Sequence, residues 1–330
     1  MLPSLAALVE PETAGDPMSA QKWVRSSLRR LSQRLGLAGH PASPPTVARL
    51  LRRLDYSLKA NRKERETGSN HPQREAQFAH IEAEKARHRQ AHQPIISVDT
   101  KKKELIGDFK NAGRDWYREA EVVGVHDFPS AALGRSVPYG VYDVGRNQGY
   151  VRVGTSADTP QFAVEAIRAW WETEGRGAYG PADRLLILAD GGGSNSCRSR
   201  VWKQQLQKQL CDQFGLTVTV CHYPTGCSKW NPVEHRLFGP ISLQWAGHPL
   251  RTWETMLAYL RGTTTTTGLR VTAALHDAVY AKGQAVSDAE MARLNLEPHA
   301  VCPQWNYTVQ PHSPTTPDGA AGLSELQVIS

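Results

Sequence analysis

The stretch IISVDTKKKEL, Ile95–Leu105, joins a short apolar run to a carboxylate and three lysines. Its first four residues are mostly apolar and are typical of a buried strand. Asp99 ends that run, and Lys101–Lys103 follow after one intervening residue, Thr100. A carboxylate at the end of a buried strand, beside several cations, favours a site for a metal ion and a polyanionic substrate. The alternative is a solvated strand edge whose charges prevent aggregation.

Strand-like and helix-like segments alternate around this stretch, between residues 94 and 262. Five segments indicate strands: IISVD, VPYGVYDV, GYVRVGTS, RLLILAD and LTVTVCHYP. Two amphipathic segments indicate helices: FAVEAIRAWWETEG and SRVWKQQLQKQLCDQFG. This alternation predicts an α/β fold in which helices flank a mixed sheet.

Two further acids lie at places comparable to Asp99. Asp190 ends RLLILAD, and Glu234 lies in NPVEHRLF, where Asn231 or Pro232 can begin a helix. Acids at the ends of neighbouring strands, joined by one from a helix, supply the oxygen ligands that Mg²⁺ prefers. Two such ions activate the nucleophile and stabilise the leaving oxygen in phosphodiester displacement. Asp143 also ends a strand and is a fourth candidate, although a turn acid explains it equally well.

The positive charge of the chain is concentrated near its start. The whole chain has a net charge of +7, whereas residues 19–65 hold 12 basic and 2 acidic residues, which is +10. The remainder is therefore slightly acidic. Attraction to a polyanion such as DNA is expected to come mainly from residues 19–65.

Two amphipathic segments in this basic region predict a helix-turn-helix module. WVRSSLRRLSQRLGL carries apolar residues at helical spacing, and TVARLLRRLDYSL follows a turn in which Ser43 can cap a helix. The second helix would present Arg49, Arg52 and Arg53 to a DNA groove, and we assign Lys59 to the same surface. The alternative is a basic face that only contacts solvent.

We predict six segments along the chain. Residues 66–93 are strongly polar and indicate a connecting helix, which is either a spacer or a track along DNA. The predicted segments are 1–18, an N-terminal segment; 19–65, the helix-turn-helix module; 66–93, the helical linker; 94–262, the catalytic domain; 263–308, a C-terminal extension; and 309–330, a disordered tail.

Composition excludes several other classes of protein. No apolar run approaches the roughly 20 residues that a membrane helix needs, and the first residues lack a secretory signal, so we expect a cytoplasmic protein without a membrane partner. Five cysteines without a Cys-x-x-Cys pair indicate reduced thiols. The spacing of Cys221, His222, Cys227 and His235 fits no standard zinc site.

Several longer motifs resemble those of the Rhodopirellula-type transposases of bacterial insertion sequences, the Azo-thirteen family. The resemblance implies an RNase H-like catalytic core with an Asp-Asp-Glu triad, preceded by DNA-binding helices. Matched to those motifs, the triad is Asp99, Asp190 and Glu234. The motifs are SVDTKKKELIGDFKNAGRDW, VHDFPS, PYGVYDVGRNQGYVRVG, ADGGGSN, CHYPTGCSKWNPVEHRLF and TTTTTGLRV.

The resemblance also implies the chemistry. Water attacks a phosphodiester at the end of the element, and the freed 3′-hydroxyl attacks target DNA, with two Mg²⁺ or Mn²⁺ ions held by the triad. Lys101, Lys229 and His235 would steady phosphates or the leaving group, although His235 could instead be a packed polar residue. The implied partner is double-stranded DNA, and the pairing of two element ends implies at least a homodimer.

One departure from the family pattern favours a second function. The resemblance implies a helical segment ahead of LVEPETAGDP, a motif that begins here at Leu8. The alternative is therefore a truncated or repurposed DNA-binding protein, derived from a transposase, that no longer moves DNA. A third class, an RNase H-like nuclease that acts on another nucleic acid, is disfavoured by the basic helical module.

Overall fold

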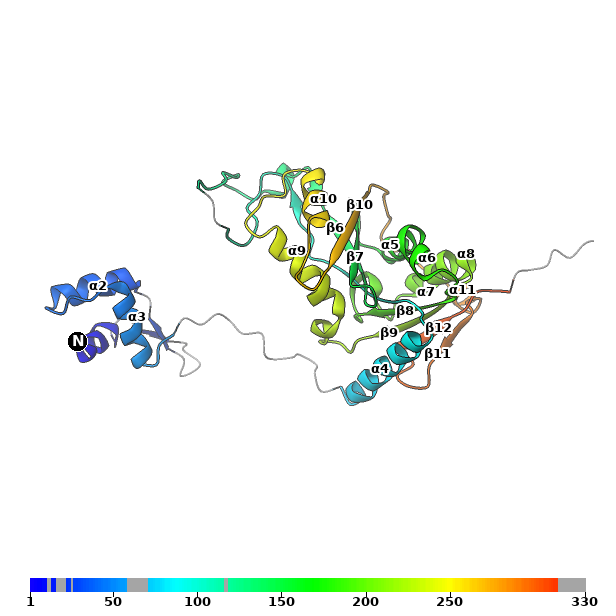
Figure 1. Ribbon diagram of the computed structural model, residues 1–330, viewed down its shortest axis with the longest axis horizontal. Helices are drawn as coiled ribbons and strands as arrows, with labels where there is room; N and C mark the ends of the chain where they lie inside the picture. The colour runs from blue at the N-terminus through cyan, green and yellow to red at the C-terminus, as the bar shows by residue number, and fades with distance from the viewer. Residues whose placement is uncertain (11–12, 16–21, 25, 58–70, 116–117, 314–330) are drawn as a thin grey trace, which may run out of the picture. The chain divides into compact units, whose positions relative to one another are not determined.

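A computed structural model describes residues 1–10, 13–15, 22–24, 26–57, 71–115 and 118–313 (Figure 1). The chain divides into two compact units, Met1–Arg65 and Glu66–Ser330. The predicted DNA contact Lys59 lies outside the described residues, as do part of the predicted linker and most of the predicted tail.

The first unit is a small helical domain. Ser27 and Ser43 cap its second and third helices by accepting the backbone N–H groups of Arg30 and Thr46. Its elements are α1 (Leu2–Val9), β1 (Thr13–Gly15), β2 (Lys22–Val24), α2 (Leu28–Leu37) and α3 (Pro44–Arg53). Its core consists of Leu5, Val9, Leu31, Leu35, Val47 and Leu50.

The structure of this unit differs from two of the predictions. The first predicted helix begins at Leu28 rather than Trp23, because residues 22–24 pair with β1 as a short antiparallel strand. The predicted N-terminal segment is not separate from the module, because Leu5 and Val9 of α1 are buried in the same core as α2 and α3. The assignment of these helices as a helix-turn-helix motif remains a prediction.

The second unit is built on an eight-stranded mixed sheet of order β10-β7-β6-β3-β8-β9-β12-β11. In its centre, β6 is antiparallel to β3 and β7, whereas β8 and β9 run parallel to β3. This arrangement is the RNase H-like α/β fold that we predicted. The strands are β3 (Ile95–Thr100), β6 (Val137–Asp143), β7 (Gln148–Gly154), β8 (Arg184–Ala189), β9 (Thr217–His222), β10 (Arg270–His276), β11 (Leu296–Pro298) and β12 (Asn306–Val309). A separate two-stranded sheet pairs β4 (Leu105–Ile106) with β5 (Gly134–Arg135).

The residues predicted as a C-terminal extension complete this sheet at both edges. β10 pairs in parallel with β7, and β12 pairs antiparallel with β9.

The predicted start of the disordered tail, at residue 309, is too early. Val309 ends β12, and the backbone groups of residues 310–312 hydrogen-bond to Asn295, Gln207 and Asp212.

Helices cover both faces of the sheet (Figure 1). Alternate residues of β3 and β8 pack against α5 and α7 on one face, and the residues between them pack against α4 on the other. The helical elements are α4 (Arg74–Gln90), α5 (Pro160–Trp170), η3 (Trp171–Gly175), α6 (Arg176–Tyr179), α7 (Arg200–Leu206), η5 (Gln207–Cys211), α8 (Asp212–Phe214), η7 (Glu234–Phe238), α9 (Gly239–Gln244), α10 (Trp253–Arg261) and α11 (Asp288–Met291). Short 3₁₀ turns are η2 (Pro129–Ala131), η4 (Gly193–Asn195) and η6 (Ser228–Trp230).

The predicted polar linker contains a helix, but that helix is not a spacer. Ile81 of α4 is buried against β3, β8 and β9. Gln77 is buried as well, and its amide donates to the His222 carbonyl and to Asn306, both at 2.7 Å. The polar sequence of α4 is compatible with burial because its inward side chains have hydrogen-bond partners.

No helix in the described part of the chain is long and apolar enough to cross a membrane.

Candidate active site

The register of two parallel strands brings the first two predicted acids together. Val98 of β3 lies beside Ala189 of β8, so the next residues, Asp99 and Asp190, follow at the same edge of the sheet. Side chains alternate between the faces of a sheet, and both acids point to the same face as Ser97. The strand-end positions inferred from the sequence therefore become neighbours in space.

The third acid is held near them by a buried polar contact. The Ser97 hydroxyl donates to Oδ1 of Asn231 at 2.5 Å, and Nδ2 of Asn231 donates to the Val98 carbonyl at 3.1 Å. The Val233 N–H donates to the Ser97 hydroxyl at 2.8 Å. Both Ser97 and Asn231 are fully buried. These bonds attach the helical turn that carries Glu234 directly to β3, next to Asp99.

The three acids repel one another. Burial raises the pKa of Asp99 to about 8, and the charges of Asp190 and Glu234 add to this rise. A backbone hydrogen bond from Thr100, at 2.7 Å, opposes it. Burial and the charge of Glu234 also raise the pKa of Asp190, although the Gly192 N–H bonds its carboxylate. Divalent cations would relieve this repulsion, and a donor set of carboxylates fits Mg²⁺ or Mn²⁺. The carboxylate oxygens of Asp99, Asp190 and Glu234 do not all lie within 4.8 Å of one another.

The loop after Asp190 is tied to the sheet by side-chain hydrogen bonds. The hydroxyl of Tyr139, on β6, donates to Oδ1 of buried Asn195 at 2.6 Å. The hydroxyls of Ser194 and Thr100 lie 3.2 Å apart. The glycine-rich segment is thus a fixed strand-to-helix turn. Asn195 and Tyr139 were not predicted as parts of the site, because the glycine-rich motif alone does not show their partners.

The three lysines after Asp99 differ in exposure and in the groups that they contact. Lys101 is only 7% exposed, and its Nζ lies 4.6 Å from the centre of the Trp245 ring and 3.8 Å from Glu104. Burial lowers its pKa. A cavity of about 370 Å³ is lined by both Lys101 and Glu234. Lys102 pairs with Glu104 at 3.6 Å, and Lys103 pairs with Asp158 at 3.2 Å.

Lys229, Trp230 and His235, which flank Glu234 in the sequence, are exposed. Nε2 of His235 hydrogen-bonds the Lys229 carbonyl, and the ammonium of Lys229 lies 5.6 Å from the centre of the Trp230 ring. Trp230 itself is 52% exposed and meets Phe78 edge-on. The DNA contacts of Lys229 and His235 remain predictions.

Asp143 belongs to a hairpin and not to this site. Its strand runs antiparallel to β3, so Asp143 lies beside Ile96, whereas Asp99 lies beside Gly140. Its Oδ1 accepts the N–H groups of Gly145 and Arg146, both at 3.0 Å. The turn interpretation of this acid therefore explains its contacts.

The five cysteines are buried and free, consistent with the expected reduced thiols. The side chains of Cys221, His222, Cys227 and His235 do not come together as a metal site. His222 is buried, and its ring donates to the Asp190 carbonyl at 2.8 Å. Burial lowers the pKa of His222 to about 4, which keeps its imidazole neutral.

Comparison with known proteins identifies the family. The family model described as the Rhodopirellula transposase DDE domain matches residues 4–311. The chain belongs to this family. The resemblance drawn from the motifs is thereby confirmed, and the transposase DDE family accounts for nearly the whole chain.

Two solved structures are similar to part of this DDE-family chain. The Mos1 transposase paired-end complex with the left transposon end has a TM-score of 0.42 at 14% identity, covering 79% of this chain and 69% of that one. The Mos1 Strand Transfer Complex has a TM-score of 0.43 at 13% identity, with the same coverage. No curated protein matches the sequence.

Proposed function

We propose that this chain is the DNA transposase of a bacterial insertion sequence, which cuts the element's ends and joins them to target DNA. The observation that carries the proposal is the convergence of Asp99, Asp190 and Glu234 at one edge of an RNase H-like sheet. Membership of a transposase DDE family supports it. The proposed partner is double-stranded DNA, and a homo-oligomer would hold the two element ends together.

Three carboxylates would hold two Mg²⁺ or Mn²⁺ ions in this proposal. When bound, the ions would supply an activated water or 3′-hydroxyl and stabilise the leaving oxygen. The strand ends fix Asp99 and Asp190, and the bonds of Asn231 fix the backbone that carries Glu234. The ammonium of Lys101 lines the same cavity as Glu234 and would orient a backbone phosphate there.

Loss of Asn231 tests the positioning of Glu234. Asn231→Ala would leave the Ser97 hydroxyl and the Val98 carbonyl with fewer partners inside the protein. We expect the free energy of unfolding to fall by about 1–3 kcal/mol, and end cleavage to slow at least about tenfold. Chemical denaturation and single-turnover cleavage would measure both effects.

A control variant tests whether the loss of an asparagine side-chain hydrogen bond elsewhere also slows cleavage. Asn295→Ala removes a 3.2 Å hydrogen bond to the Pro311 carbonyl, away from the acids, and should leave cleavage unchanged. Normal cleavage by folded Asn231→Ala would contradict the positioning role.

The exposed arginines of α3 test DNA binding by the first unit. Arg49, Arg52 and Arg53 are exposed, as a DNA-binding surface requires. Changing all three to Gln should weaken binding to duplex DNA and flatten the slope of log K against log salt by up to roughly 2.7, at about 0.9 per phosphate contact. Fluorescence anisotropy over a salt series would measure the slope.

The control for charge alone changes three exposed basic residues of the second unit to Gln: Arg89, Arg135 and Lys282. An equal loss of slope in both variants would show that α3 is not the specific contact surface.

The proposed function is tested by cleavage and joining in vitro. A labelled duplex with the element's own end is incubated with the full chain, a supercoiled plasmid, and Mg²⁺ or Mn²⁺. We expect a nick at the element end and a labelled, joined plasmid, and neither product in the presence of EDTA. Binding of the end without nicking would overturn the proposal in favour of the repurposed DNA-binding protein.

A further inference from the structure

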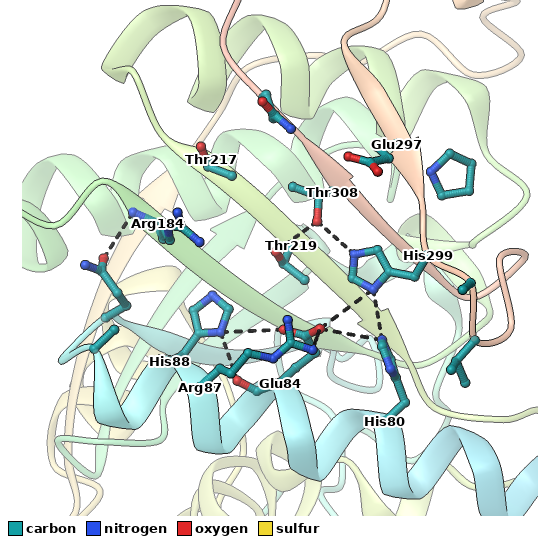
Figure 2. Close-up of a pocket in the computed structure, with 16 residues that line it drawn as sticks. His80, Glu84, Arg87, His88, Arg184, Thr217, Thr219, Glu297, His299 and Thr308 are labelled. Carbon is teal, nitrogen blue, oxygen red and sulfur yellow. Dashed lines mark hydrogen bonds and ion pairs between the residues drawn. The ribbon is translucent and has the colours of Figure 1, made fainter.

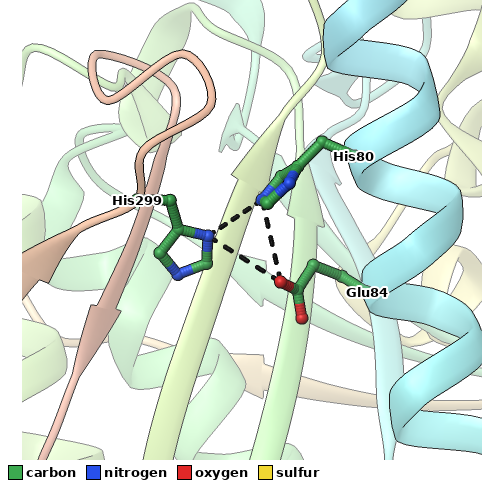
Figure 3. A group of neighbouring side chains, drawn as sticks. All are labelled: His80, Glu84 and His299. Carbon is green, nitrogen blue, oxygen red and sulfur yellow. Dashed lines mark hydrogen bonds and ion pairs between the residues drawn. The ribbon is translucent and has the colours of Figure 1, made fainter.

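A second cluster of metal-ligating side chains lies in the second unit, on residues different from the three acids. His80 and Glu84 are four residues apart on α4, which places them on one face of that helix. His299 comes from the segment between β11 and β12, 219 residues after His80 (Figure 3). In the described part of the chain, these are the three His, Cys, Asp or Glu residues whose ligand atoms all lie within 4.8 Å.

The distances in this cluster suit a small cation. Nε2 of His80 lies 2.9 Å from Nδ1 of His299, and Oε1 of Glu84 lies 3.7 and 3.8 Å from those two nitrogens. Figure 3 shows the three ligand atoms facing one another. A tetrahedral ion with ligand distances of about 2.0–2.1 Å separates its ligand atoms by about 3.3 Å. Shifts of about half an ångström would therefore close these atoms around an ion.

The surroundings already orient the ligands. Nε2 of His299, the nitrogen turned away from the cluster, hydrogen-bonds the Thr308 hydroxyl at 2.8 Å (Figure 2). That hydroxyl lies 3.1 Å from the Thr219 hydroxyl. A second ring nitrogen fixed by a protein group is typical of histidines that bind metals. Burial lowers the pKa of both His80 and His299, which keeps them in the neutral form that binds cations.

Two other charged or titratable groups face Glu84. The Arg87 guanidinium lies 2.7 Å from Oε1, and Nδ1 of His88 lies 4.0 Å from Oε2 (Figure 2). The Arg87 side chain is 67% exposed, so it can turn into solvent when a cation takes its place on the carboxylate. Glu84 itself is almost fully buried, with 4% of its side chain exposed. A carboxylate buried to this degree requires a positive partner.

We propose that His80, Glu84 and His299 form a binding site for one first-row divalent transition-metal ion, best matched by Zn²⁺. Two imidazoles and one carboxylate suit such an ion, whereas Mg²⁺ prefers oxygen ligands alone. All three residues line a cavity of about 670 Å³, which Arg184 and Thr217 also line. A water or a small ligand therefore has room to complete the coordination.

The ion would link α4 to the C-terminal strand pair. Its ligands come from the helix that begins the second unit and from the connection between the two outermost strands at one edge of the sheet. Since such an ion binds the folded chain more tightly than the unfolded one, it stabilises the fold. The site thus has a structural role that is independent of the proposed phosphodiester chemistry.

The test measures Zn²⁺ binding by the full chain, in excess Mg²⁺, by competition with a chromogenic chelator. We expect one Zn²⁺ per chain and a rise in melting temperature of about 5 °C at a hundredfold excess over Kd. His80→Gln and His299→Gln should each weaken binding at least about 100-fold. The exposed-histidine control His126→Gln and the triad variant Glu234→Gln should keep it.

A second measurement uses the wild-type chain alone, so it does not depend on whether the variants fold. Co²⁺ substituted for Zn²⁺ should give the visible spectrum of nitrogen and oxygen ligands. A sulfur-to-cobalt charge-transfer band would assign the ion to cysteines and overturn the proposal. Absence of stoichiometric Zn²⁺ binding would also overturn it, as would unchanged binding by both histidine variants.

Discussion

Asp190→Asn is expected to lower the rate of metal-dependent cleavage of an element end by at least about a thousandfold, or about 4 kcal/mol of activation free energy. Asn is nearly the same size as Asp, but it lacks the negative charge that a divalent cation requires. Asp190 lies where β8 ends, beside Asp99, and burial raises its pKa. Single-turnover cleavage of a labelled end duplex measures the loss.

Asp143→Asn is the matched control for this experiment. It makes the same chemical change in an acid that also ends a strand, but whose oxygen accepts hydrogen bonds from the β6–β7 turn. We expect cleavage by this variant to stay within a few fold of the wild type. Comparable loss of activity in both variants would mean that the effect reflects stability and not the ligands of a catalytic ion.

Asp99→Asn is expected to stabilise the metal-free protein near neutral pH, although it should abolish cleavage. The pKa of Asp99 is raised to about 8 in the folded state, from an ordinary value of 3.8. Between these two values the folded chain holds a proton that the unfolded chain loses, so the stability contributed by Asp99 falls as pH rises. At about 1.4 kcal/mol per pKa unit, Asn at this position should add roughly 2–5 kcal/mol at pH 8.

Chemical denaturation of the metal-free protein at pH 5, 6.5 and 8 measures this effect. The wild type should lose stability through this range relative to Asp99→Asn. The control Asp183→Asn changes an exposed acid at the start of β8 and should follow the wild type. Lower stability of Asp99→Asn at pH 8, or parallel pH profiles for it and the wild type, would contradict the repulsion among the three acids.

The core of the fold was predictable from sequence because its signals are local. The five central strands are short apolar runs bounded by turn residues, and each forms close to its predicted place. Ser43 and Pro44 mark the start of α3 in the same way. The strand-end positions of Asp99 and Asp190 were equally visible, because each acid directly follows an apolar run.

The remaining features depend on partners distant in the sequence. Ser97 and Asn231 are 134 residues apart, and nothing beside either one indicates that they hold Glu234 together. The burial of α4 was missed for a similar reason, since Gln77 bonds residues more than 140 positions away. His80 and Glu84 have the spacing of ligands on one helical face, but only the fold brings His299 to them.

We propose that Asp99, Asp190 and Glu234 together hold the divalent cations used for phosphodiester chemistry. The most direct test counts the Mn²⁺ ions bound per chain, by electron paramagnetic resonance, with the element-end duplex present. Two chains are compared, and both carry His299→Gln to remove the second proposed site. One chain has intact acids, and the other also carries Asp99→Asn, Asp190→Asn and Glu234→Gln. We predict two more ions in the chain with intact acids. Equal binding by both chains would contradict this role of the three acids.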